Sequence, residues 1–117
     1  MLDKDVIAQL IVDIGEDVFL RLSQQFLDET LNRLSAMSDC HRRQAWTELA
    51  RHAHSLKSTA QSFGLKGTGL QARDLQMAAD NLDLAEIEKL LPPLLVVAAD
   101  ECREFAGLRQ SLGVSSR

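Results

Sequence analysis

Several residue types are scarce in this chain, and each shortage excludes something. The 117 residues include no Tyr, one Trp, two Pro and two Cys, and aromatic residues make up only 4%. Cys40 and Cys102 lack the spacing of a metal-binding or redox pair, so free thiols in a reducing compartment are predicted. The core must be built mainly from Leu, Ala, Val and Ile. The scarcity of β-branched runs then favours helices over strands.

Long apolar runs and excess positive charge are also absent. The most apolar stretch, 90–99, contains Pro92 and Pro93 and is shorter than the roughly 20 residues that span a bilayer. Acidic residues stand at Asp3 and Asp5, where a signal peptide would carry basic ones. We therefore expect a cytoplasmic protein with no membrane partner. The net charge of −4 argues against a nucleic-acid partner, which usually meets a basic surface.

The length and composition suit one folded domain. Hydrophobic residues make up 45% of the chain and charged residues 26%, which is ordinary for a soluble domain with its own core. There is no internal repeat and no low-complexity segment. A single domain over residues 1–117 is predicted, with a frayed tail at about 113–117.

Apolar residues recur at helical spacing in five segments. The predicted helices cover about 3–14, 16–37, 42–63, 65–81 and 84–112. Gly15 and Gly64 suit helix ends, and Ser38-Asp39 is expected to form a turn or a cap. Pro92 and Pro93 should kink or break the last helix. Long helices with short connections predict an all-α fold: an antiparallel four-helix bundle with a short extra N-terminal helix across one end.

The same spacing predicts which side chains form the core. In 42–63, steps of three and four repeat without exception through Trp46, Leu49, Ala53, Leu56, Ala60 and Phe63. The stripe of 16–37 is wider, as expected for a helix with two neighbours, and includes Phe19, Leu22, Phe26, Leu27, Leu31 and Leu34. Leu82 is expected to complete the inner stripe of the fourth segment.

A polar face lies opposite the apolar stripe of 42–63. At about 100° per residue, an arc is shared by Ala50, His54, Lys57, Ser58 and Gln61. A neutral imidazole is a good nucleophile near pH 7, because its ordinary pKa is about 6.5. Lys57, one turn on, could pair with phosphoryl oxygens, and the small Ser58 leaves room for a partner. This face could carry a phosphoryl group on His54, with Ala50, Ser58 and Gln61 facing the partner, although by spacing alone an exposed histidine near a lysine is more often ordinary solvated surface.

These residues resemble the histidine-containing phosphotransfer (HPt) family. The match begins at His54-Ser-Leu-Lys57-Ser58, continues with Thr59-Ala60 and Phe63-Gly64-Leu65, and extends into the next helix at Arg73-Asp-Leu75-Gln76. The resemblance covers most of the chain, from the second segment to the fifth. It also implies the helical bundle that the spacing predicts. Ser58 stands where Gly is commoner, and Thr59 and Gln61 stand where small residues are usual. Gln61 therefore bears on partner choice.

The resemblance implies definite roles. His54 would accept a phosphoryl group from the aspartyl phosphate of a receiver domain and pass it to another response regulator in two-component signalling. Lys57 would stabilise the phosphoryl oxygens, and Gln76 would hold the other ring nitrogen or contact the phosphoryl group. The chain would be a monomeric phosphocarrier without kinase activity, since it has no Gly-rich nucleotide loop. It would need no cofactor, and Mg²⁺ would be bound by the receiver.

Three other interpretations stay open. A histidine kinase dimerisation domain would carry an acidic residue directly after the histidine, where this chain has Ser55. A degenerate HPt domain could act as a binding module without phosphorylation. A metal site at His52 and His54, with His41, is disfavoured because the i, i+2 spacing puts His52 and His54 on opposite flanks of a helix. No metal site is therefore predicted.

Overall fold

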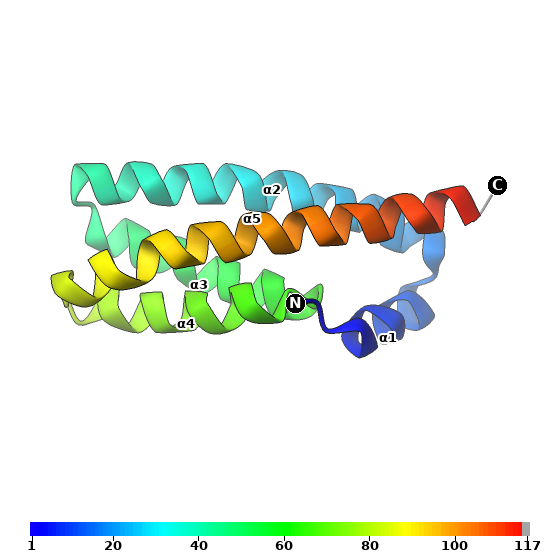
Figure 1. Ribbon diagram of the computed structural model, residues 1–117, viewed down its shortest axis with the longest axis horizontal. Helices are drawn as coiled ribbons and strands as arrows, with labels where there is room; N and C mark the ends of the chain where they lie inside the picture. Colours follow the sequence, from blue (N-terminus) through cyan, green and yellow to red (C-terminus); the bar gives the residue numbers. More distant parts are fainter. Residues whose placement is uncertain (116–117) are drawn as a thin grey trace.

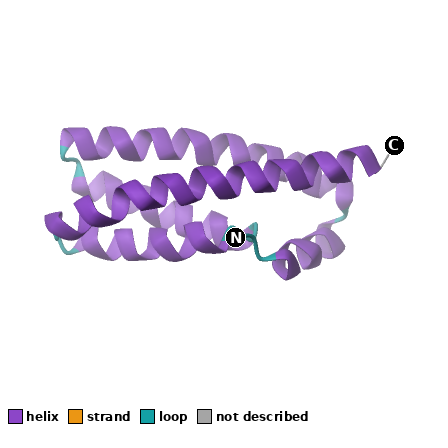
Figure 2. Cartoon of the chain, in the orientation of Figure 1, coloured by secondary structure: helices purple, strands orange, loops and turns teal. Residues whose placement is uncertain are grey.

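The computed structural model describes residues 1–115, which form five α-helices (Figures 1 and 2). They are α1 (Lys4–Ile14), α2 (Glu16–Arg43), α3 (Trp46–Ser62), α4 (Lys66–Asp80) and α5 (Leu84–Ser115). Over this range there is no strand, only an isolated bridge between Leu2 and Leu65. The prediction of an all-helical fold is confirmed.

The four longer helices lie side by side along the 49 Å long axis, and the chain reverses direction at each connection (Figure 1). α3 contacts α2 and α4, and α5 contacts α4 and α2, so each of these four helices packs against two of the others. α1 packs against α2 at the end of the bundle where α5 finishes (Figure 1). There the backbone amide of Asp3 donates to the Gly64 carbonyl at 2.7 Å, which fixes α1 to the α3–α4 connection.

The core consists of two clusters that follow each other along the bundle. The first is aliphatic and includes Met37, Leu49, Leu56, Leu75, Ile87 and Leu94. The second gathers all four phenylalanines, with the rings of Phe26 and Phe63 stacked at 4.3 Å and Phe105 edge-on to both. The four phenylalanine side chains are therefore concentrated at the α1 end, where they close the bundle, while Trp46 packs against the aliphatic cluster.

Two predicted helix boundaries, at the connection between α2 and α3, are wrong. α2 runs through Ser38-Asp39 to Arg43, because Met37 and Cys40 continue its buried stripe and Asp39 pairs with Arg42 and Arg43 within the helix. α3 correspondingly begins at Trp46 and not near residue 42.

The double proline does not break α5. Pro92 and Pro93 are both exposed, and the buried Leu91 and Leu94 on either side hold the helix against the core. α5 also continues to Ser115, past the predicted end at 112, so the predicted frayed tail is helical up to that residue. The rest of that tail, 116–117, lies outside the described residues.

Three leucines expected in the core are exposed: Leu22, Leu31 and Leu82. On α2 the buried stripe is narrower than the apolar pattern, and Ser23 and Thr30 occupy buried positions beside it. The Ser23 hydroxyl donates to the Leu20 carbonyl at 3.3 Å, so its burial leaves no donor unpaired. Leu82 has a left-handed backbone in the α4–α5 turn (φ 53°), so helical spacing no longer applies to it.

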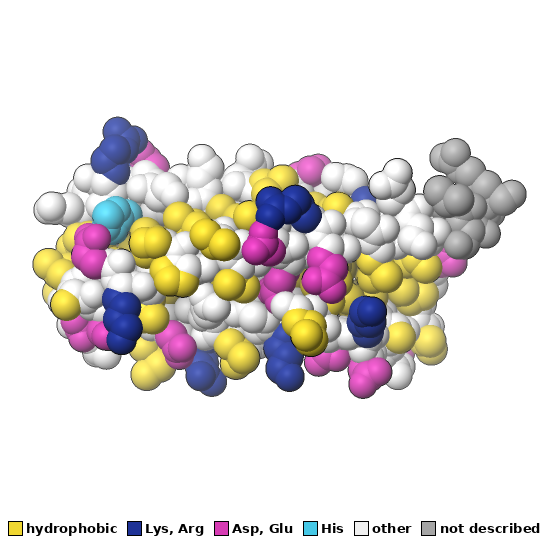
Figure 3. All heavy atoms as spheres, in the orientation of Figure 1, with side chains coloured by type: hydrophobic (Ala, Val, Ile, Leu, Met, Phe, Trp, Pro, Cys, Tyr) yellow, Lys and Arg dark blue, Asp and Glu magenta, His cyan; other side chains and the backbone are white. Residues whose placement is uncertain are grey.

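The described residues contain no helix long and apolar enough to cross a membrane. On the face drawn in Figure 3, acidic and basic side chains are interspersed with hydrophobic ones and do not gather into a basic patch. This distribution agrees with the acidic net charge of the chain.

Truncation of Leu56 tests the position of the α3 stripe. Leu56 is fully buried in the aliphatic cluster, so Leu56→Ala should lower the free energy of unfolding by about 2–5 kcal/mol. The loss comes from apolar burial and from the cavity left behind. Leu70→Ala on α4 is the control, because Leu70 is 44% exposed and should change stability by less than about 0.5 kcal/mol. Equal effects in denaturant titrations would contradict the assigned stripe.

Candidate functional site

The candidate site lies on α3, on the side facing away from the core. Leu49, Ala53, Leu56 and Ala60 form the buried stripe of this helix, while His54 is exposed. Because Ala53 and Leu56 are buried, the helical repeat directs the imidazole of His54 into solvent. His54 is thus held on a helix whose position the core determines.

His54 meets α4 at Gln76. The Nδ1 atom of His54 lies 3.3 Å from Oε1 of the half-buried Gln76. An amide oxygen only accepts hydrogen bonds, so Nδ1 is the donor and carries the hydrogen. In the neutral ring, Nε2 then has the free lone pair. The pairing therefore fixes one tautomer and directs the nucleophilic nitrogen away from α4.

The other residues predicted on this face occupy the same helix. Lys57 is half-buried, and no carboxylate within residues 1–115 forms an ion pair with it. Its ammonium group is available one turn beyond His54. Ser58 and Gln61 are exposed, as a surface that meets a partner requires. Arg73 of α4 is also exposed and pairs weakly with Asp74, at 3.5 Å.

Ala50 does not belong to this face. It is only 7% exposed and packs in the aliphatic cluster, so its predicted role in facing a partner is wrong. The reason is that α3 lies between α2 and α4, and the covered arc extends beyond the apolar stripe at the start of the helix. The exposed part of the site therefore begins at His54 and continues toward Gln61.

Gly69 lets α3 and α4 approach closely beside the site. A Cβ atom on Gly69 would lie 3.0 Å from Cγ of Gln61 and 3.7 Å from the carbonyl oxygen of Lys57. The first distance is shorter than an ordinary carbon–carbon contact, so a side chain at position 69 would require the Gln61 side chain to shift, while the contact with the Lys57 carbonyl would be ordinary. Glycine at this position thus leaves room for Gln61 between the two helices.

Glu101 of α5 holds the N-terminus of α4, and the sequence analysis did not identify it. Leu65 precedes α4 and has no side chain that can cap it. The Glu101 carboxylate, 2% exposed, accepts instead from the amides of Gly67 and Thr68 at 3.0 and 2.7 Å. It also accepts from the Thr68 hydroxyl at 2.6 Å and from the Met1 ammonium at 2.7 Å. The sequence could have indicated this role, because Glu101 lies within the inward stripe of α5 and α4 begins without a residue that can cap it.

His52 lies on the other flank of α3 and faces α2. Its Nδ1 accepts from Nη1 of Arg33 at 3.1 Å. Burial lowers the pKa of His52, and the Arg33 guanidinium lowers it further, so the ring is neutral near pH 7. Within residues 1–115, the three histidines do not form the metal group weighed from the sequence. His52 and His54 therefore have separate surroundings and separate roles.

The site therefore combines a helical fold with an exposed histidine that contacts a glutamine of the neighbouring helix. The family model of the Hpt domain matches residues 21–110, which is most of the chain, and the chain belongs to this family. The comparison with curated proteins and the comparison with solved structures give no match. The family thus supports phosphotransfer in two-component signalling and interaction with receiver domains.

Proposed function

We propose that this chain is a relay intermediate that takes a phosphoryl group onto His54 from an aspartyl phosphate of one receiver domain and delivers it to another. It works as a single domain over residues 1–117, an antiparallel four-helix bundle, and as a cytoplasmic monomer without kinase activity. The contact between Nδ1 of His54 and Oε1 of Gln76 is the observation that carries the proposal, because it prepares one nitrogen for attack.

The tautomer with its hydrogen on Nδ1 determines which nitrogen of His54 reacts. The Nε2 lone pair attacks phosphorus, a nitrogen–phosphorus bond forms, and the bond between phosphorus and the aspartyl oxygen breaks. The electron pair of that bond stays on the aspartate, while the hydrogen on Nδ1 stays there and remains donated to Oε1 of Gln76. The phosphorylated ring is cationic, so its imidazole departs easily in the reverse step, which suits a carrier.

Lys57 stabilises the charge that the transfer brings to this face. Phosphoryl transfer depends mainly on positioning and on electrostatic stabilisation of the phosphoryl oxygens. An ammonium one helical turn from the imidazole can reach those oxygens, and no carboxylate in residues 1–115 competes for it. Mg²⁺ would be supplied by the receiver, and the chain itself would need no cofactor. Ser58 and Gln61 would contact the receiver around the imidazole.

The direct test is transfer of labelled phosphate from phosphorylated receiver domains to the wild-type chain. We expect label on the chain, labile to acid and stable to base, as a phosphohistidine requires. A second, unlabelled receiver should then remove it. Absence of label from a broad set of receivers, with the helical fold intact, would contradict the proposal and favour a binding module without phosphorylation.

Removal of the Gln76 acceptor should slow transfer without moving its site. Gln76→Leu keeps the side-chain size but loses a hydrogen bond of about 0.5–1.5 kcal/mol that selects the reactive tautomer. We therefore expect a rate about tenfold lower, since 1.36 kcal/mol corresponds to a factor of ten. Gln71→Leu, on another face of α4, is the matched control. Equal rates for Gln76→Leu and wild type in rapid-quench measurements would exclude a role for the tautomer.

A further inference from the structure

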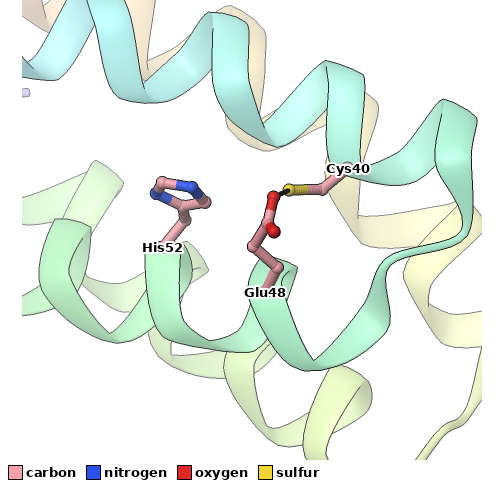
Figure 4. Close-up of side chains that lie close together, drawn as sticks. All are labelled: Cys40, Glu48 and His52. Atoms are coloured by element: carbon pink, nitrogen blue, oxygen red, sulfur yellow. Dashed lines mark hydrogen bonds between the residues drawn. The ribbon is translucent and has the colours of Figure 1, made fainter.

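A second cluster of chemically active side chains lies between α2 and α3, on the flank opposite His54. It consists of Cys40 from α2 and of Glu48 and His52 from α3 (Figure 4). One thiol sulfur, one carboxylate oxygen and one imidazole nitrogen all lie within 4.8 Å of one another. In Figure 4, Glu48 and His52 extend from α3 toward α2, and Cys40 meets them from the other side.

The backbone brings these three together by simple geometry. Glu48 and His52 are four residues apart on α3, so they share one face of the helix, one turn from each other. Cys40 lies in the last turns of α2, which packs against α3. Two ligands at i, i+4 with a third from a facing helix can converge on one point. The arrangement depends on two packed helices and not on a loop.

The geometry points to a binding site for a zinc-like divalent metal ion with Cys40, Glu48 and His52 as its ligands. Thiolate, imidazole and carboxylate are the donors that Zn²⁺ takes in proteins, at about 2.0–2.3 Å. Two ligands of one tetrahedral ion are then roughly 3.2–3.8 Å apart. Cys40 Sγ and Glu48 Oε2 are already 3.1 Å apart, so small side-chain rotations complete the set.

Each ligand has the lone pair or the exchangeable hydrogen that binding needs. The Cys40 thiol donates its hydrogen to Oε2 of Glu48, and this proton leaves for solvent when the sulfur–metal bond forms. Nδ1 of His52 accepts from Arg33, so the neutral ring carries its exchangeable hydrogen on Nε2, and an ion bound at the ring replaces either that hydrogen or the Arg33 contact. One thiolate and one carboxylate would neutralise a divalent charge.

Two arginines occupy the positions that the ion would take over. Arg43 donates to Oε2 of Glu48 at 2.6 Å, and Arg33 donates to His52. Arg43 is 47% exposed and also donates to Asp39 at 2.7 Å, so it keeps a partner when it releases Glu48. Glu48 is 48% exposed, which gives the ion a path from solvent and a fourth position for water. Removal of Arg43 should therefore favour metal binding.

The inference is independent of the proposed function, because His54 lies on the other flank of α3. The test is titration of the reduced full chain with Co²⁺, which reports thiolate ligation by a charge-transfer band, followed by displacement with Zn²⁺. We expect one ion per chain. His52→Gln and Glu48→Gln should each weaken binding at least tenfold, and Cys40→Ser should abolish the band. Arg43→Gln should bind more tightly than wild type.

Matched controls separate this site from metal bound elsewhere. Cys102→Ser removes the other thiol, and His54→Gln removes the exposed imidazole; both should bind Co²⁺ like wild type. Circular dichroism establishes that each variant is folded, and the partly exposed Glu48 and His52 provide variants that do not depend on replacing buried Cys40. Absence of the band in wild type, its persistence in Cys40→Ser, or undiminished affinity in both α3 variants would overturn the site.

Discussion

Uptake of labelled phosphate should fall below detection in His54→Gln, while the fold stays intact. The variant removes the only imidazole that pairs with Gln76, and a glutamine amide has no nucleophilic nitrogen near neutral pH. Since the His54 side chain is exposed, its loss should change the free energy of unfolding by less than about 0.5 kcal/mol. The measurement pairs labelled transfer from a phosphorylated receiver with a denaturant titration of the same preparation.

The other histidines provide the controls for this result. His52→Gln and His41→Gln should both retain phosphate uptake, because His52 faces α2 and His41 pairs with Glu88 at 2.6 Å. Label that persists in His54→Gln but disappears in His52→Gln would place the phosphorylated residue on the α2 flank. Such a result would refute the face assigned here.

Replacement of Glu101 by alanine should cause the largest loss of stability among the substitutions considered, about 3–5 kcal/mol. The variant leaves the amides of Gly67 and Thr68 and the Thr68 hydroxyl without their acceptor inside the bundle. Because these groups lie in the first turn of α4, the variant should also hold Gln76, on the same helix, less firmly in place. Glu104→Ala, one turn along α5 and exposed, should cost less than about 0.5 kcal/mol.

The stability that Glu101 contributes should depend on pH with a definite sign. Burial by itself raises the pKa of this carboxyl, but the hydrogen bonds from the Met1 ammonium, from Thr68 and from Gly67 outweigh it, and the net pKa is below the ordinary 4.5. The contribution is therefore present above about pH 4.5 and lost as the pH falls through the lowered folded-state pKa. Denaturant titrations of wild type and Glu101→Ala should converge in acid. A constant difference would contradict this account.

Much of the fold was predictable because helical spacing is a local property. All five helices were expected, and the stripe of α3 was identified through Leu49, Ala53, Leu56 and Ala60, which are all buried. The errors occurred where tertiary packing overrides the pattern. Ala50 is covered by neighbouring helices, Leu31 is left exposed by a narrower contact, and Ser38-Asp39 stays helical because the buried stripe passes through it.

The site was predictable in part for a similar reason. His54 and Lys57 share one helix, so spacing alone places them on one face. Gln76 was expected only from the family resemblance, because it comes from another helix. Glu101 lies 33 residues from Thr68 along the chain, and local spacing carries no information about such a pairing. The cluster of Cys40, Glu48 and His52 also depends on how two helices pack.

The close crossing at Gly69 separates two kinds of recognition. Because α3 and α4 are already in contact there, and His54 already meets Gln76, a receiver that docks at His54 would lose little binding free energy to ordering the imidazole. A receiver would therefore meet the same centre whichever partner binds. Discrimination among partners would then come from the exposed rim, such as Gln61, where side chains can vary without disturbing the chemistry. The proposed function would thus combine a fixed reactive centre with an adaptable periphery.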